Sequence, residues 1–259
     1  MISAVVLTKN EEKNIERCIN SLLWCDEIVI IDDYSEDETI NIIKNAKVKI
    51  FQRKLNGDFA GQRNFGLGKA SGEWVLFVDS DEEVSRELRE EILEILKHIR
   101  QAQCKQVQDG MNGFYINRVD YFLGKWLKYG ETGDIKFLRL ARKVGGEWKG
   151  RIHEVWEVTG KIGELKNPIQ HFPHETVSEF LKEVNIYTDL VAQYWNEEGK
   201  KISYWEIVLY PIGKFIHNYI IRLGFLDGGE GFIMAAMMSF HSFLARGKYW
   251  LLRHNDKDT

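Results

Sequence analysis

Short apolar runs that alternate with helix-like segments constrain the fold of this chain more than any other feature. The runs cover residues 3–7, 27–31, 48–51 and 74–78. Their length and continuous apolar character are typical of strands that are buried on both faces of a sheet. Strands that alternate with helices form a mostly parallel sheet with right-handed crossovers. We therefore predict an α/β fold with a Rossmann-like, mostly parallel central sheet flanked by helices.

Apolar residues at helical spacing mark the segments between and after these runs. We expect helices at residues 11–23, 59–70, 82–100 and 175–194, and a helix start at 35–38. Asn10 would cap the first of these helices. Residues 101–112 are polar and predict a loop, whereas 113–119 and 135–142 predict further strands.

Polar clusters follow three of the four predicted strands. They are Thr-Lys-Asn-Glu at 8–11, Asp-Asp at 32–33 and Asp-Ser-Asp at 79–81. In open α/β sheets, ligands bind beyond the carboxyl ends of the strands. Because acidic residues placed at random would not select the same sheet edge three times, the clusters predict a binding site there.

Asp79 and Asp81 form the cluster with the most direct chemistry. Two carboxylates that are two residues apart can converge in a turn, and their hard oxygen ligands suit Mg²⁺ or Mn²⁺. A cation bound there would neutralise a diphosphate. The alternative is a solvated acidic turn in which Asp81 caps the following helix.

Asp32 and Arg63 are the next candidates for ligand binding. A carboxylate such as Asp32 can accept a hydrogen bond from a uracil N–H or a sugar hydroxyl, although turn formation is the alternative. Arg63 lies in the Gln-Arg-Asn segment 62–64 and could pair with a phosphate or orient an acidic ligand. A solvated helix face is the commoner position for an arginine.

Glu154 lies between Trp148 and Trp156 in the sequence. An acid among bulky aromatic residues can have a raised pKa and can serve as a general base. An ion pair with a nearby basic residue is the alternative. His171 or His174 could ligate the metal through a neutral imidazole, but a single histidine more often has a structural role.

Several functional classes are disfavoured by composition and by missing motifs. The net charge is −4, with no strongly basic character, so we expect no nucleic-acid partner. Neither G-x-G-x-x-G nor G-x-x-x-x-G-K-[ST] occurs, which argues against a dinucleotide dehydrogenase and a P-loop NTPase. Cys18, Cys25 and Cys104 match no metal-ligand spacing and predict reduced thiols in a cytosolic protein.

Four motifs in order resemble those of glycosyltransferase family 2, which has the GT-A fold. They are the segments 5–11 (Val-Val-Leu-Thr-Lys-Asn-Glu), 30–39, 62–64 and 72–82 (Gly-Glu-Trp-Val-Leu-Phe-Val-Asp-Ser-Asp-Glu). Within the family the chain is most similar to glycosyltransferases of the lipopolysaccharide inner core. That likeness is based on Phe-Leu-Arg-Leu at 137–140, on Ile-His-Glu at 152–154 and on segments between 214 and 228.

The resemblance implies a role for each matching residue. Thr8, Asn10 and Asp32 would line the nucleoside pocket, Glu11 would support its loop, and Arg63 would reach the base or the phosphates. Asp79 would contact the ribose or the metal, and Asp81, beyond Ser80, would bind the metal directly.

Glu154 occupies the place of the catalytic base in the family. Here a His-Glu pair replaces the Glu-Asp pair of many relatives. The resemblance implies a single inverting displacement. It would move a sugar, expected to be a hexose, from a nucleoside-diphosphate sugar such as a UDP-sugar to an acceptor hydroxyl. The acceptor would be a glycolipid or a saccharide, with lipopolysaccharide core as one option.

The C-terminal region, from residue 201 to 259, is rich in aromatic residues and differs from the catalytic region that we predict for residues 1–200. Residues 204–225 approach the length of a spanning helix, but charged residues and Pro211 interrupt them. We expect two helices, 204–225 and 232–244, that lie on a membrane surface or form a homo-oligomer interface.

Two other functions remain open from the sequence. A sugar-nucleotide nucleotidyltransferase also uses acidic metal ligands, but Thr-Lys-Asn-Glu is not its usual Gly-rich loop. A non-catalytic, membrane-associated scaffold with a nucleotide fold is the second. Since no signal peptide precedes the first strand, we expect a cytoplasmic protein, with peripheral association at the inner face of the cell membrane as an option.

Overall fold

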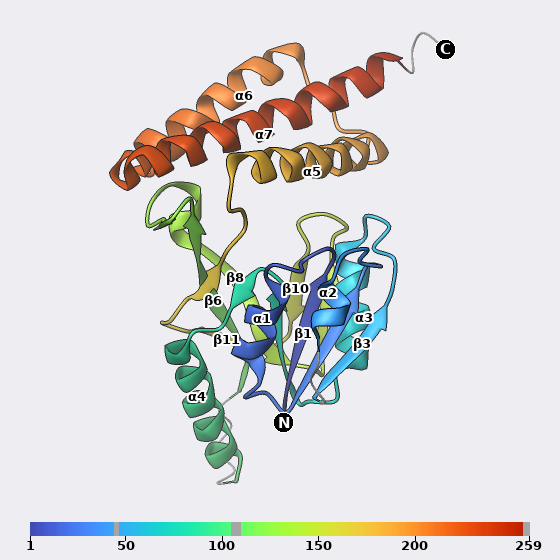
Figure 1. The fold of residues 1–259 in the computed structure, drawn as a ribbon, viewed down its shortest axis with the longest axis vertical. Helices are drawn as coiled ribbons and strands as arrows, with labels where there is room; N and C mark the ends of the chain where they lie inside the picture. Colours follow the sequence, from blue (N-terminus) through green and yellow to red (C-terminus); the bar gives the residue numbers. More distant parts are fainter. Residues whose placement is uncertain (44–46, 105–109, 256–259) are drawn as a thin grey trace. The chain divides into compact units, whose positions relative to one another are not determined.

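The computed structural model describes the backbone of residues 1–43, 47–104 and 110–255, and the side chains of 1–43, 47–101 and 110–254. The chain forms two compact units, coloured along the sequence in Figure 1. The first comprises Met1–Arg118 and Lys136–Phe172, and the second comprises Val119–Ile135 and Pro173–Thr259. Helix α5 (Val177–Glu197) belongs to the second unit, whereas the sequence placed it in the catalytic region. The division at residue 200 stays a prediction.

Four parallel strands form the centre of the first unit, in the order β3-β2-β1-β4. They are β1 (Ile2–Thr8), β2 (Glu27–Asp32), β3 (Val48–Gln52) and β4 (Trp74–Asp79). Strand β8 (Ile135–Arg142) then pairs antiparallel with β4. The four strands predicted from apolar runs are confirmed, and the sheet of the predicted α/β fold is present.

Further strands extend the sheet beyond β8. The order continues from β8 through β6 (Met111–Phe122) and β12 (Ile169–His171) to β5 (Glu82–Glu83), and β11 (Lys161–Glu164) pairs parallel with β6. A separate hairpin consists of β9 (Gly146–Lys149) and β10 (Val155–Val158). The strand predicted at 113–119 is therefore part of the longer β6.

Helices cover both faces of the central strands because alternate side chains of a strand point to opposite faces. On one face, Val6 and Ile30 pack with α1 (Ile15–Leu22) and α4 (Arg86–Cys104). On the other, Val5 and Ile31 pack with α3 (Phe59–Lys69). The remaining helix of this unit, α2 (Thr39–Ile42), is a single turn.

Three predicted helix starts are wrong. The helix expected to start at 35–38 is α2, which begins at Thr39. Helix α1 begins at Ile15 rather than at residue 11, and Asn10 has a φ of 54° and does not cap it. The Asn10 side chain instead accepts a hydrogen bond from the Glu36 N–H at 2.8 Å. Helix α4 begins at Arg86, because Glu82 belongs to the short strand β5. Part of the loop predicted at 101–112 lies outside the described residues, and α4 extends to Cys104.

The second unit is mainly helical. Its elements are β7 (Lys125–Trp126), η1 (Gly130–Asp134), α5, α6 (Tyr204–Ile216), the π-helical turn η2 (His217–Ile221), η3 (Gly224–Asp227) and α7 (Gly228–Asn255). Its core contains Phe122, Phe180, Met234 and Met237. The two predicted C-terminal helices are present with different limits: a π-helical turn and a 3₁₀ turn replace the end of the first, and the second is longer at both ends.

Both described cysteine side chains are buried free thiols. Cys18 and Cys25 are almost fully enclosed. Burial raises the pKa of each thiol, so neither is a reactive thiolate near neutral pH. The side chain of Cys104 lies outside the described residues.

A buried carboxylate joins three segments at the amino end of the sheet. Glu27 of β2 accepts hydrogen bonds from the Ser3 hydroxyl of β1, from the N–H and hydroxyl of Ser71, and from Lys49 of β3 at 2.8 Å. Burial alone would raise its pKa, but the hydrogen bonds from Lys49, Ser3 and Ser71 lower the pKa of Glu27 to about 2. The charged carboxylate therefore stabilises the fold.

We expect Glu27→Gln to reduce the free energy of unfolding at pH 7 by about 1–3 kcal/mol, because buried donors lose a charged acceptor. A folded-state pKa that is lower than the unfolded value contributes stability above the unfolded pKa, and this contribution is lost as pH falls. The difference between wild type and variant should shrink from pH 4.5 towards about pH 2. Urea unfolding across this range measures it, and a difference that stays constant would contradict the prediction.

Candidate active site

Strand register brings three predicted site residues together at the carboxyl edge of the sheet. Thr8 of β1 lies opposite Asp32 of β2, and Leu7 of β1 lies opposite Asp79 of β4. Neighbouring strands are about 5 Å apart. The three polar clusters therefore gather at one edge, as the sequence predicted, rather than lying on separate faces.

The loop after β1 presents Thr8 and Asn10. The Thr8 hydroxyl is buried and, within the described part of the chain, has no hydrogen-bond partner. The Asn10 N–H donates to Ser35 Oγ at 2.9 Å, which ties this loop to the one after β2. Glu11 accepts a hydrogen bond from Asn14 Nδ2 at 2.8 Å, and its N–H donates to Thr39 Oγ1 at 2.7 Å. These bonds fit the predicted supporting role of Glu11.

Asp32 is fully buried and is held from two directions. Its carboxylate accepts hydrogen bonds from the N–H and hydroxyl of Ser35, at 3.1 and 2.6 Å, and from Gln52 Nε2 at 3.0 Å. Gln52 lies opposite Asp32 in the β2–β3 register. These partners fix the orientation of the carboxylate at the sheet edge, and the sequence did not identify them.

Arg63 joins two acids that are far apart in the sequence. Its Nε donates to Glu154 at 2.7 Å, and its Nη2 donates to Asp79 at 2.9 Å. The guanidinium also lies 4.7 Å from the centroid of the Trp148 ring. Arg63 is buried although it lies on helix α3, so it does not occupy the solvated helix face that the sequence left open.

Glu154 is placed by the β9–β10 hairpin. Trp148 and Trp156 pair across this hairpin and stack with ring centroids 5.4 Å apart, and both contact Phe77 of β4 edge to face. Glu154 precedes β10, and its side chain is 15% exposed. The ion pair that the sequence left open as the alternative is present, because Arg63 donates to Glu154.

Arg139 is a central residue that the sequence analysis did not single out. It lies on β8 with 4% of its side chain exposed, and its Nη2 donates to Asp79 at 2.7 Å and to Glu82 at 2.9 Å. Its Nε and Nη1 are buried without a hydrogen-bond partner among the described residues. The available signal was an arginine within the otherwise apolar run Phe-Leu-Arg-Leu at 137–140.

The charged groups at this site shift one another's pKa values. Burial raises the pKa of the Glu82 carboxyl above its usual range. Burial acts in the same direction on Asp79, but the guanidiniums of Arg139 and Arg63 hold its pKa well below the usual value. Asp79 is therefore anionic near neutral pH, and both of its oxygens accept hydrogen bonds from arginines.

Asp81 and His171 form a second part of the site. Their carboxylate and Nε2 atoms are 3.1 Å apart. Strand β12 pairs antiparallel with β5, and the Phe172 N–H donates to the Asp81 carbonyl at 2.9 Å, which places His171 beside the Asp-Ser-Asp turn. Although burial opposes it, His171 lowers the pKa of Asp81. Ser80, between the two aspartates, is buried.

The donor set fits a cation that has only a few protein ligands. Within residues 1–43, 47–101 and 110–254, no three His, Cys, Asp or Glu side chains are grouped to hold a metal. Mg²⁺, however, is often bound by one or two carboxylates together with substrate phosphates. Asp81 and His171 fit this arrangement, whereas Asp79 is engaged by two arginines. His174, the other candidate histidine, stacks on Phe180 in the second unit.

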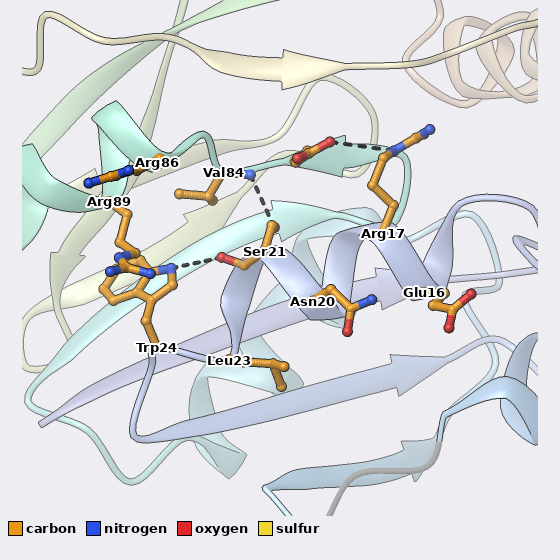
Figure 2. A pocket seen from close by; sticks show the side chains of 10 residues that line it. Glu16, Arg17, Asn20, Ser21, Leu23, Trp24, Val84, Arg86 and Arg89 are labelled. Atoms are coloured by element: carbon orange, nitrogen blue, oxygen red, sulfur yellow. Dashed lines mark hydrogen bonds and ion pairs between the residues drawn. The ribbon is translucent and has the colours of Figure 1, made fainter.

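The first unit also has an open pocket of about 590 Å³ between α1 and the start of α4. Figure 2 shows Trp24, Arg17, Arg86 and Arg89 around it. None of the residues described above as the candidate site lines this pocket. It therefore lies apart from the acidic cluster.

Comparison with known proteins identifies the family. Residues 3–151 match the model of glycosyl transferase family 2. The chain belongs to this family. The match spans β1 to β4, the Asp-Ser-Asp turn and the segment with Arg139, and with the observed sheet it confirms the predicted GT-A fold class.

The matches to similar proteins extend over nearly the whole chain. An uncharacterized glycosyltransferase of Rickettsia typhi is 28% identical, over 95% of this chain and 86% of its own length. The lipopolysaccharide core biosynthesis glycosyltransferase LpsC of Rhizobium meliloti is 27% identical, over 96% of this chain and 92% of its own length. The crystal structure of S. aureus TarS 1-349 with UDP-GlcNAc aligns over 98% of this chain and 92% of that chain, with 16% identity and a TM-score of 0.44.

Proposed function

We propose that this glycosyltransferase moves the sugar of a nucleoside-diphosphate sugar, specifically a UDP-sugar, to a hydroxyl of a glycolipid or saccharide, with inversion at the anomeric carbon and release of the nucleoside diphosphate. One observation carries the proposal: Arg63 holds Glu154 and Asp79 together, at 2.7 and 2.9 Å, beside the Asp81–His171 pair. A candidate base, a candidate phosphate-binding group and candidate metal ligands thus come from four separate segments of one unit.

The nucleotide would bind at the carboxyl ends of β1 and β2. Thr8, Asn10 and Asp32 line this edge, and Asp32 is oriented by Ser35 and Gln52. A fixed carboxylate can accept a hydrogen bond from the imide N–H of uracil. Arg63 and Arg139 each have buried guanidinium nitrogens without a hydrogen-bond partner in the part of the chain that the structure describes, and these suit an anionic diphosphate.

Asp81 and His171 would hold a divalent cation, Mn²⁺ or Mg²⁺. When bound there, the cation would supply positive charge that stabilises the departing diphosphate. Asp79 is the third predicted metal ligand, and its two arginine partners favour a role in orienting Arg63 over direct ligation.

Glu154 would take the proton from the acceptor hydroxyl while that oxygen attacks the anomeric carbon from the face opposite the diphosphate. The bond from oxygen to carbon forms as the bond from carbon to the diphosphate breaks, so no covalent enzyme intermediate is needed. The ion pair with Arg63 orients the Glu154 carboxylate until the acceptor arrives.

Asp81→Asn and His171→Ala test the metal role. Since the proposed cation stabilises charge on the leaving group, we expect each variant to lose about 10²–10³-fold in sugar transfer. Both should also lose the Mn²⁺-dependent part of UDP affinity, which calorimetry with and without Mn²⁺ measures. The control is Glu147→Gln, an exposed acid on β9. UDP affinity that responds to Mn²⁺ equally in all variants would reject the assignment.

The acceptor is proposed to be a lipid-linked or free saccharide, including lipopolysaccharide core, because LpsC is named for that process. A cytoplasmic enzyme with a lipid-linked acceptor would work at the inner face of the membrane. In the described residues, no helix is both long and apolar enough to cross a bilayer.

A further inference from the structure

Helices α6 and α7 form an antiparallel hairpin in the second unit (Figure 1). Its two arms contact each other along their length: Tyr204 meets Trp250, the Ser239 hydroxyl donates to the Pro211 carbonyl at 2.7 Å, and Phe215 meets Phe232. Helix α7 packs against both α5 and α6. Within this unit α6 is therefore covered mainly from the side of α7.

The side of α6 that α7 leaves uncovered carries an apolar stripe. Its residues are Trp205, Leu209, Ile212 and Ile216 of α6, at steps of four, three and four, followed by Ile220 of the adjoining turn η2. The spacing within α6 puts the first four on one helix face. Each is between 43% and 69% exposed.

The stripe continues at the tip of the hairpin. Ile221, Leu223, Phe225 and Leu226 are also exposed there, between 43% and 65%. Water-soluble proteins rarely expose so many large apolar side chains on one contiguous segment. The surface therefore requires a partner, and its charges indicate which one.

No acidic residue occurs in segments 207–226 and 231–255, which together form most of the hairpin. Both segments contain basic residues: Arg222, Arg246 and Arg253, and also Lys214 and Lys248, which pair with Glu131 and Asp189 at 2.6 and 2.7 Å. Arg222 is exposed at the tip, and Arg253 is exposed at the opposite end of the hairpin, where its Nη1 donates to the Lys200 carbonyl. Basic groups thus flank the apolar stripe at both ends.

We propose that this α6 face, defined as the stripe of five residues together with the exposed residues of the tip, binds the surface of a bilayer that contains anionic lipid. A helix that lies in the bilayer interface has aromatic and aliphatic residues on one face and basic residues at the level of the headgroups. A second copy of this chain would bring the same basic groups close to one another, so charge complementarity favours the anionic surface. This proposal rests on the proposed function, since the bilayer surface is where the enzyme would reach a lipid-linked acceptor.

The test is sedimentation of the full-length protein with vesicles of phosphatidylcholine alone or with added phosphatidylglycerol. We expect the protein to sediment with the anionic vesicles, and we expect added salt to weaken this binding. The variant Leu209→Glu/Ile212→Glu, which places two charges inside the stripe, should reduce partitioning by about tenfold or more. Arg222→Gln should reduce it less.

The matched control is Leu181→Glu/Ile186→Glu, which places the same two charges on exposed positions of α5. It should bind vesicles as the wild type does. Circular dichroism and thermal melting establish that both double variants fold. Vesicle binding measures no sugar transfer, so a failure here and a failure of the proposed reaction are separate results.

Two results would overturn the proposal. One is vesicle binding by Leu209→Glu/Ile212→Glu that equals that of the control and the wild type. The other is a wild-type protein that ignores anionic vesicles but sediments as a dimer in the ultracentrifuge, with the dimer lost only in the α6 variant. The second result would assign the same face to a copy of the chain.

Discussion

Glu154→Gln is expected to lower the turnover of sugar transfer by about 10²–10⁴-fold, the usual contribution of a general base. Glutamine keeps the shape of the side chain and can still accept a hydrogen bond from Arg63 Nε, which Glu154 accepts at 2.7 Å. It cannot take a proton from the acceptor. Affinity for UDP should therefore remain close to the wild-type value, because Arg63 and Asp79 stay in place.

Single-turnover transfer and calorimetry with UDP separate these two effects. Glu157→Gln is the matched control, since Glu157 lies on the adjacent strand β10 with 58% of its side chain exposed and pairs only with a surface lysine in the described structure. It should leave turnover unchanged. Equal turnover in Glu154→Gln and Glu157→Gln would remove Glu154 from the role of base.

Arg139→Met is expected to destabilise the fold by about 3–5 kcal/mol, because removal of one partner leaves buried charge without compensation. Glu82 has no exposed side-chain surface, and Asp79 would lose one of its two arginines. Arg142→Met on the same strand is the control. Its surface pair with Glu73 should contribute at most about 1 kcal/mol.

A double variant tests the cause of this loss. Arg139→Met/Glu82→Gln removes both the cation and the buried anion, so its destabilisation should be smaller than the sum of the two single changes. Denaturant unfolding of the wild type, Arg139→Met, Glu82→Gln and the double variant measures this coupling energy directly. Additive losses would show that the pair with Glu82 is not the cause of the destabilisation in Arg139→Met.

The sequence predicted the parts of the fold that depend on local pattern. The four apolar runs became β1 to β4, and the clusters after β1, β2 and β4 met at one edge because parallel strands align their carboxyl ends. The same reasoning failed at Asn10. A helix cap is a local feature, but the Asn10 side chain accepts its hydrogen bond from Glu36, which is distant in the sequence.

The partners of the site residues could not be predicted, because they depend on register between distant strands. Arg139 reaches Asp79 through the antiparallel pairing of β8 with β4, and His171 reaches Asp81 through the pairing of β12 with β5. Neither pairing has a signal in the local sequence. His171 was a candidate only as one of two histidines, and the fold separates it from His174, which stacks on Phe180.

The position of β1 has a consequence for synthesis of the protein in the cell. Strand β1 emerges from the ribosome before both of its partners, since it pairs with β2 on one side and with β4 on the other. Until Asp79 has emerged, one full edge of an apolar strand is open to pairing with a neighbouring nascent chain. Translation speed and chaperone binding over this stretch should therefore govern how much native enzyme a cell obtains.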